Sequence, residues 1–318
     1  MSERYLWDRS GEEDRDVARL ERLLSAYRYS RPAPAIPIAP GAGRPRLAAF
    51  LAAAATLLLA AGAFVLLRAL ERGAEWEVVS LSGSPTVNRQ SIGETARLGT
   101  GEWLETDDAS RARLAVADIG NVTIEGGTRL RLVATRPTEH RLELARGEIR
   151  ASILAPPRLF FVDTPAATAV DLGCAYRLVV DDAGAGFLHV TFGRVAFERD
   201  GRDSIVPHGA LCRTRPGVGP GTPWFQDATD ALREALERLD FEGGGAADLA
   251  IVLREARVRD TLTLWHLLSR VEKDGRKAIV DRMGELSCLP SDVDLGRVLS
   301  LDEKELERLH SVLEDSWW

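Results

Sequence analysis

The longest unbroken apolar stretch of the chain is an uncharged run from Leu47 to Leu67. Its 21 residues match the ~20 that a helix needs to cross a hydrocarbon core about 30 Å thick. A buried helix of a globular protein would normally keep a polar stripe, whereas here only Thr56 interrupts the apolar and small residues. A cleavable signal peptide would have a shorter apolar segment closer to the N-terminus. The pattern therefore predicts a single, uncleaved transmembrane helix over residues 47–67.

Residues 76–215 show a different pattern, in which short runs alternate apolar and polar positions between Gly, Asp, Asn and Pro. Leu142 and Leu144, for example, point to one side of a strand, with His140 on the same side at the edge. This recurrence predicts a mainly β domain, either a sandwich, a barrel or a short β-solenoid. The strands are expected at Trp76–Leu81, Trp103–Thr106, Arg111–Val116, Val122–Ile124, Arg129–Val133, His140–Leu144, Glu148–Leu154, Leu159–Val162, Ala175–Val180, Phe187–Phe192 and Val195–Glu198.

A stretch rich in Gly and Pro, residues 217–223, closes this domain as a linker. Its glycines do not join a strand to a helix in a βαβ unit, which argues against a nucleotide-binding loop. After Trp224 the apolar residues recur with a helical period, so residues 224–318 are predicted to form an α-helical module. Its last helix is expected from about Asp302, with Ser300 and Glu303 as a capping box.

The segment before the apolar run, residues 1–46, contains one amphipathic helix. Ser10 and Glu13 form a capping-box pattern, which predicts a helix start. An apolar stripe follows at helical spacing, with Trp7 as a flanking anchor beside Tyr5 and Leu6; the stripe consists of Val17, Leu20, Leu24 and Tyr27. A helix this short cannot bury such a stripe against itself, so it needs a partner: the membrane surface, a second copy, or a cytoplasmic protein with a groove. A proline-rich spacer, residues 31–41, then leads to the membrane.

Charge sets the orientation of the predicted span. Four arginines precede it, whereas the two that follow are mixed with glutamates; the preceding ones are Arg28, Arg31, Arg44 and Arg46. By the positive-inside rule, residues 1–46 are cytoplasmic and residues 68–318 lie on the periplasmic or extracytoplasmic side of the inner membrane. The net charge of −7 gives no overall attraction for nucleic acid, and arginines spread along the whole chain do not form a phosphate-binding patch.

Cysteine, histidine and paired aspartate side chains, which form metal and catalytic sites in other proteins, show no such spacing in this chain. The three cysteines lack a CxxC motif and the five histidines lack HxH or HExxH, so no metal or cofactor is predicted. Asp107–Asp108 and Asp181–Asp182 fall where strands turn, which favours a backbone-capping role over paired catalytic acids. Cys174 and Cys212 share one exported domain, so they either form a disulfide or remain two separate buried thiols. We therefore expect no enzyme activity.

The β domain resembles a FecR domain over about residues 76–200. The resemblance rests on the order and spacing of six blocks: Trp76–Gly83, Leu98–Thr106, Ser110–Ala112, Gly126–Leu130, Leu144–Ile149 and Phe161–Gly173. It implies a membrane regulator whose outer domain receives a signal and whose cytoplasmic segment controls an extracytoplasmic-function sigma factor. The tail contains no His or Cys, so a zinc-binding anti-sigma domain is excluded. The helical module stands where receptor-coupled members have a small α/β lobe, so their iron-siderophore pathway is not implied.

These observations lead to two function hypotheses. In the first, the protein is a single-pass envelope sensor that binds a cytoplasmic sigma factor through the apolar stripe of its tail and an unknown envelope protein or ligand through its outer domain. In the second, it is an envelope scaffold or ligand-binding protein, for polysaccharide, peptidoglycan or another protein, and has no sigma-factor role.

Overall fold

The structure is a computed structural model that describes residues 15–27, 62, 75–287, 289 and 292–317. The chain divides into two compact units, Met1–Ala63 and Phe64–Trp318. The predicted transmembrane run lies outside the described residues apart from Gly62. Within the described ranges, no helix combines the length and apolar character needed to cross a membrane. The transmembrane helix therefore stays a prediction.

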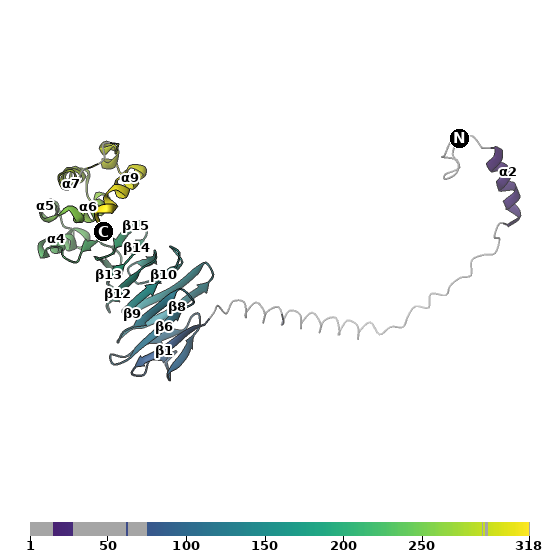
Figure 1. The fold of residues 1–318 in the computed structure, drawn as a ribbon, viewed down its shortest axis with the longest axis horizontal. Coiled ribbons are helices and arrows are strands. Elements are labelled where there is room, and N and C mark those ends of the chain that lie inside the picture. Colours follow the sequence, from purple (N-terminus) through teal and green to yellow (C-terminus); the bar gives the residue numbers. More distant parts are fainter. Residues whose placement is uncertain (1–14, 28–61, 63–74, 288, 290–291, 318) are drawn as a thin grey trace. The chain divides into compact units, whose positions relative to one another are not determined.

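The first unit contains one described helix. Helix α2 (Arg15–Leu24) continues into the 3-10 helix η1 (Ser25–Tyr27), where the Ser25 hydroxyl donates to the carbonyl of Arg22 at 2.7 Å (Figure 1). The proposed start of this helix, the capping box at Ser10 and Glu13, is outside the described residues.

The second unit begins with two β-sheets that share one long strand, β9 (Glu139–Ile153) (Figure 1). The first sheet runs in the order β4 (Thr95–Leu98), β1 (Trp76–Ser82), β6 (Arg111–Val116), β7 (Gly120–Ile124), β9, β12 (Ala175–Val180), β13 (Gly186–Phe192) and β16 (Ala210–Arg215), with β17 (Gly219–Pro220) and β18 (Trp224–Phe225) beside β16. The second sheet runs in the order β3 (Gln90–Ser91), β2 (Thr86–Val87), β5 (Trp103–Glu105), β8 (Arg129–Arg136), β9, β10 (Phe160–Asp163), β11 (Thr168–Asp171), β14 (Arg194–Arg199) and β15 (Arg202–Pro207).

Strand β9 passes from one sheet to the other at Gly147. Residues up to Arg146 pair with β8 and β10, whereas residues from Gly147 onward pair with β7 and β12. Gly147 has a φ of +98°, and a Cβ built there would lie 2.3 Å from the Cα of Thr128. Glycine is needed at this bend because of its positive φ and because a side chain would clash with Thr128. The sequence analysis treats residues 140–144 and 148–154 as separate strands, and the structure joins them.

The inward residues of both sheets form one core, which confirms the alternating pattern. Leu142 and Leu144 are fully buried, and His140 on the same side is 7% exposed. The His140 ring packs edge-on to Trp76, whose indole donates to the Thr135 hydroxyl at 3.1 Å. Of the described strand pairs, only β9 with β10 is parallel. Two mainly antiparallel sheets around one core correspond to the sandwich alternative and not to a β-solenoid.

Helices follow the sheets within the same unit, as the sequence predicts. Their bounds are α4 (Asp230–Phe241), α5 (Ala246–Glu255), η2 (Val258–Asp260), α6 (Thr261–Leu268), α7 (Lys273–Leu286), α8 (Leu295–Leu299), α9 (Glu303–Leu313) and η3 (Glu314–Trp317). Helix α8 is not anticipated by the sequence analysis. Asp302, rather than Ser300, caps α9 by accepting from the backbone N–H of Glu305 at 3.3 Å. Residues 217–223 are expected as a linker, but residues 219–225 are buried and contribute β17 and β18.

The helices are tied to the sheets along strand β15. On the side away from β14, the His266 Nε2 of α6 lies 3.3 Å from the backbone nitrogen of Ile205 and 3.2 Å from its carbonyl oxygen. The C-terminal residues dock as well, because the Trp317 indole is buried and donates to the Thr261 hydroxyl at 3.0 Å. Trp318 is outside the described residues.

Candidate functional site

The apolar stripe of helix α2 is the first candidate site, and the structure exposes it. No residue of α2 is buried. Leu20, Leu24 and Tyr27 are 56%, 61% and 86% exposed, and Leu23, which the sequence analysis leaves out, is 65% exposed. Val17 is half-buried. Trp7, predicted as a flanking anchor, lies outside the described residues together with Tyr5 and Leu6.

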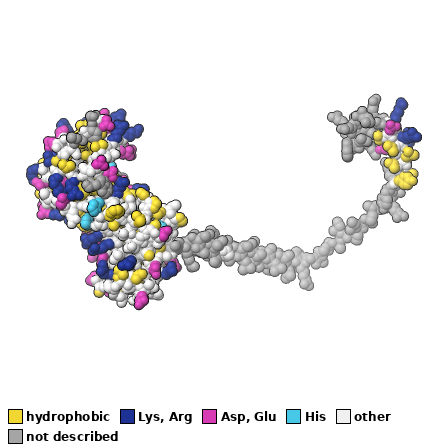
Figure 2. Space-filling view, viewed as in Figure 1, with side chains coloured by type: hydrophobic (Ala, Val, Ile, Leu, Met, Phe, Trp, Pro, Cys, Tyr) yellow, Lys and Arg dark blue, Asp and Glu magenta, His cyan; other side chains and the backbone are white. Residues whose placement is uncertain are grey.

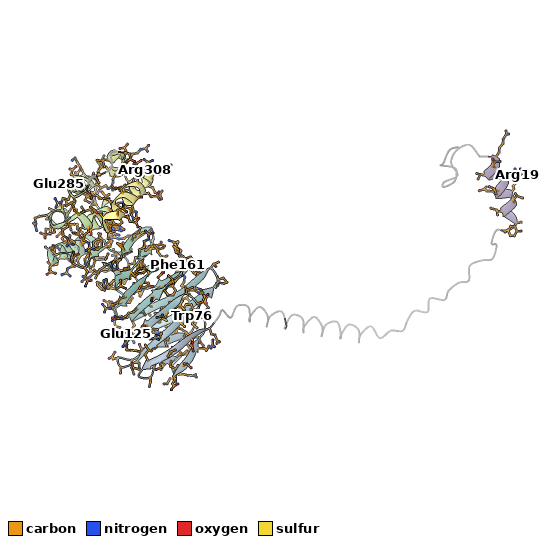
Figure 3. All side chains as sticks on the ribbon, in the orientation of Figure 1. Arg19, Trp76, Glu125, Phe161, Glu285 and Arg308 are labelled. Carbon is orange, nitrogen blue, oxygen red and sulfur yellow. The ribbon has the colours of Figure 1, made fainter. Side chains whose placement is uncertain are left out.

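Helical geometry places these residues on one side of α2 and arginines on the other. At 100° per residue, positions 17, 20, 23, 24 and 27 fall within an arc of about 120°, and Arg15, Arg19 and Arg22 lie outside it. Hydrophobic side chains gather on the surface of this helix in Figure 2. Arg19, one of the three arginines outside the arc, is labelled on α2 in Figure 3. A helix of this kind can insert its apolar side into a groove of another protein, with positions i, i+3, i+4 and i+7 as anchors.

The structure selects the second of the two alternatives for the cysteines: Cys174 and Cys212 are both free, buried thiols and do not form a disulfide. Strand β13 lies between the strand that follows Cys174 and the strand that contains Cys212. Two strand spacings amount to about 10 Å, which exceeds the Cα separation of at most ~7 Å that a disulfide allows. Cys174 and Cys212 therefore lie in one domain but too far apart to form a disulfide. Cys288 is outside the described residues.

Each thiol has its own polar partner instead. The Cys174 Sγ donates to the Asp171 carboxylate at 2.7 Å, and the Cys212 Sγ donates to the carbonyl of Gly221 at 3.2 Å. Burial raises the pKa of both thiols, in Cys212 to about 12. Both are therefore thiols rather than thiolates at neutral pH, which makes them poor nucleophiles.

Asp171 is a buried acid at the crossover between the sheets. Its side chain is 1% exposed and accepts from the backbone N–H of Gly173 at 2.7 Å in addition to the Cys174 thiol. Burial raises the pKa of this carboxyl to about 6, although these hydrogen bonds act in the opposite direction. The nearby Tyr176 hydroxyl is buried without a partner among the described residues. We therefore expect the stability of this crossover to depend on pH.

The acidic pairs act at turns, as the sequence analysis interprets them. The Asp107 carboxylate accepts from the backbone N–H of Ala109 at 3.1 Å, and that of Asp181 accepts from the N–H of Ala185 at 2.9 Å. Across the part of the chain that the structure describes, no three His, Cys, Asp or Glu side chains are arranged to hold a metal ion.

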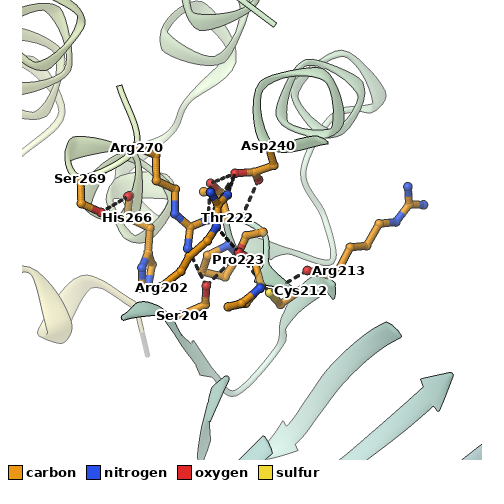
Figure 4. A network of polar contacts seen from close by, with 12 residues as sticks. Arg202, Ser204, Cys212, Arg213, Thr222, Pro223, Asp240, His266, Ser269 and Arg270 are labelled. Carbon is orange, nitrogen blue, oxygen red and sulfur yellow. Dashed lines mark hydrogen bonds and ion pairs between the residues drawn. The ribbon is translucent and has the colours of Figure 1, made fainter. Parts of the chain in front are cut away.

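A second polar cluster joins the sheets to the helices, and sequence reasoning misses it entirely. Figure 4 shows Arg202 of β15, Asp240 of α4 and Arg270, which follows α6, converging on each other. The Asp240 carboxylate also accepts from the backbone N–H of Thr222 at 2.6 Å. Arg270 further donates to the Ser204 hydroxyl at 2.7 Å. Only the folded chain brings these residues together, since no local spacing or motif marks them.

His266 belongs to the same interface. Burial and the neighbouring Arg270 charge lower the pKa of its imidazole well below the ordinary value, so the ring is neutral. The sequence analysis treats the five histidines as structural residues, and His140 and His266 are both buried with polar partners.

Part of the β domain is similar to a known protein family. Residues 102–196 match the family model described as "FecR protein". Two crystal structures of a "putative anti-sigma factor from Parabacteroides distasonis ATCC 8503" align with 42% of this chain, each with 16% identity and a TM-score of 0.35. The aligned part covers 63% and 62% of those chains, less than two thirds of their length. No curated protein matches this chain.

Proposed function

From the FecR domain that residues 102–196 form, we propose that this protein is a regulatory, non-catalytic signal transducer of the bacterial envelope. In this proposal it is anchored in the inner membrane by residues 47–67, receives a signal in the outer domain, and controls an extracytoplasmic-function sigma factor through the cytoplasmic residues 1–46. The arginines before residue 47 support this orientation by the positive-inside rule.

The observation that carries the proposal is the exposed stripe of α2. Three of its leucines are more than half exposed, although burying a leucine fully would stabilise a complex by about 1.5–3 kcal/mol. The leucines are Leu20, Leu23 and Leu24. Tyr27 adds an aromatic anchor with a polar end, a residue type enriched in binding hot spots. In this mechanism the stripe binds the sigma factor and covers an apolar groove that the factor needs. A signal outside the cytoplasm then changes that contact or releases the tail.

The test replaces two residues of the stripe in the full-length protein. The double variant Leu20→Asp with Leu24→Asp places two charges where burial is proposed, which removes apolar contact and adds desolvation costs of several kcal/mol. The matched control, Ser25→Asp with Ala26→Asp, adds the same charge to exposed positions outside the apolar arc. Affinity capture of the tagged proteins from membranes, together with transcription of the sigma-dependent genes, gives the readout.

We expect the stripe variant to lose the sigma factor and to raise transcription of its target genes, while the control behaves like the wild type. If the wild-type protein captures no sigma factor and the stripe variant leaves transcription unchanged, the sigma-factor role is wrong. An adjacent sigma-factor gene in the genome would support regulation, and adjacent envelope or polysaccharide genes would support the second candidate.

That second candidate, an envelope scaffold or ligand-binding protein, is favoured by one observation. A cavity of about 610 Å³ lies at β10, β11 and the β14–β15 turn. It combines the half-buried Phe161 ring and the Thr168 side chain with the ion pair of Arg158 and Glu198 at 2.7 Å. An aromatic ring among polar side chains suits a sugar-like ligand, which needs both an apolar face and hydrogen-bond partners.

A further inference from the structure

A different cavity, of about 420 Å³, lies inside the helical module beside the cluster of Figure 4. It is bounded by the end of α4, the start of α5, the end of α6 and the start of α7. Four apolar side chains contribute to its wall: Leu239, Leu249, Leu267 and Val271. Its volume falls within the ~300–1,000 Å³ of small-molecule sites, and none of the roles proposed above uses it.

One end of this cavity is buried and carries excess positive charge. Arg202 and Arg270 share a single carboxylate, at 2.8 Å and 3.3 Å from the Asp240 Oδ1. Among the described residues, the other hydrogen-bond partners of the two guanidinium groups are neutral oxygens, namely those of Pro220, Thr222, Ser204 and the Asp203 backbone. Arg270 is 7% exposed, so little water offsets its charge. The three charged groups that line this end sum to +1, which favours an anionic group of a ligand.

The cavity also has exposed acidic side chains in its wall. Glu272 and Asp274 line it, both are exposed, and neither makes an ion pair within the described residues. A ligand that fits therefore combines an anionic group for Arg202 and Arg270, a cationic group for the two acids, and an apolar part for the wall between the helices.

We propose that this cavity binds a small zwitterion with an apolar body, namely an apolar α-amino acid or a short apolar peptide with free termini. The carboxylate lies at the Arg202 and Arg270 end, and the ammonium lies at Glu272 and Asp274. The apolar side chain packs against the leucines and Val271. This assignment does not depend on what α2 binds, because it rests on the helical module and the neighbouring strand β15.

Gly245 allows the cavity to be filled without strain. It lines the cavity, has an ordinary extended φ of −128°, and a Cβ built there meets no atom within 4 Å. Gly93 gives a matched control, since a Cβ there also meets nothing within 4 Å and the residue lies outside this cavity. Gly245→Phe adds a large side chain at the wall of the cavity and should compete with the ligand for space, whereas Gly93→Phe adds the same side chain elsewhere.

The experiment uses the full-length protein purified in detergent and isothermal titration with leucine and with leucyl-leucine. We expect saturable binding of at least one of them, lost in Gly245→Phe and kept in Gly93→Phe. Leucinamide, which lacks the carboxylate, should bind at least about tenfold more weakly because a charged hydrogen bond is lost. N-acetyl-leucine, which lacks the ammonium, should lose about threefold for an exposed ion pair.

A second variant avoids any effect on packing. Glu272→Gln with Asp274→Asn removes two exposed charges, and it should weaken leucine or leucyl-leucine while leaving N-acetyl-leucine unchanged. The proposal is overturned if neither zwitterion binds up to about 10 mM, the range of the weakest specific ligands. It is also overturned if leucinamide binds as tightly as leucine, or if Gly245→Phe binds like the wild type.

Discussion

Arg270 and Asp240 form an ion pair 3.3 Å apart whose side chains are only 7% and 4% exposed. Asp240 belongs to α4 and Arg270 follows α6, and the pair is anchored to the sheets through Thr222 and Ser204. Because both charges are removed from water, each depends on the other. The pair therefore fixes how the helices sit on the sheets.

Asp240→Ala should destabilise the protein by about 3–5 kcal/mol, because Arg270 is then left buried without its carboxylate. Asp281→Ala is the matched control: it removes an exposed ion pair with Lys277, in which the side chains are 59% and 69% exposed, and should cost less than about 1 kcal/mol. Urea unfolding followed by tryptophan fluorescence measures both. Equal losses in the two variants would show that burial does not matter here.

Mass spectrometry of non-reduced peptides should find Cys174 and Cys212 as free thiols, even after export to an oxidising compartment. The physical reason is their separation across strand β13 together with burial of both side chains. Thiol-reactive reagents should modify them in the unfolded protein and only slowly in the native one. A peptide in which the two cysteines are linked would contradict the strand order.

The raised pKa of Asp171 predicts a pH-dependent stability. Its carboxyl has an ordinary pKa of 3.8 and a folded pKa of about 6, so the folded state binds the proton more tightly. The resulting stabilisation is present below pH ~4 and is lost as the pH rises through about 6, a change on the order of 2–3 kcal/mol. Asp171→Asn should lack this slope between pH 4 and 6. Parallel pH profiles of the two proteins would mean that Asp171 does not carry the effect.

A reporter enzyme fused after Trp318 should be active only if it is a type that works outside the cytoplasm. The reason is the asymmetry of arginines around residues 47–67, with Arg44 and Arg46 immediately before the run. Activity of a cytoplasm-only reporter at that position would reverse the orientation and remove the basis of the sensor proposal. Adding several arginines just after Arg72 should weaken the preference.

Strands with a regular alternation were predictable from the sequence, and β12 has the expected bounds, Ala175–Val180. The length of β9 was not predictable, because Gly147 has the local character of a turn and only the paired strands reveal it as a bend. The stripe of α2 follows from spacing alone, since exposure of a helix face needs no other element. Its partner does not follow, because a groove belongs to another molecule.

Most features that the sequence did not predict depend on contacts between residues far apart in the chain. Arg270 and Asp240 are 30 residues apart, and neither residue type nor spacing signals that they meet. For Cys174 and Cys212 the sequence left a disulfide open because both lie in one domain. The strand order, which the sequence does not reveal, keeps them apart. Burial is a property of the assembled sheets and helices, so charged residues that end up inside cannot be recognised from the pattern of the chain.

The contact of α6 with strand β15 has a consequence for solubility. A strand with unpaired backbone groups at the border of a sheet is a template for another chain, and proteins must cover or interrupt such borders to stay monodisperse. Here the His266 ring lies within hydrogen-bonding distance of the backbone of Ile205, and Arg270 donates to the carbonyl of Asp203, both on that border. A chain truncated before α4 would leave those groups open to strand addition by a second molecule. We therefore expect the β domain without the helical module to self-associate more readily than the full chain.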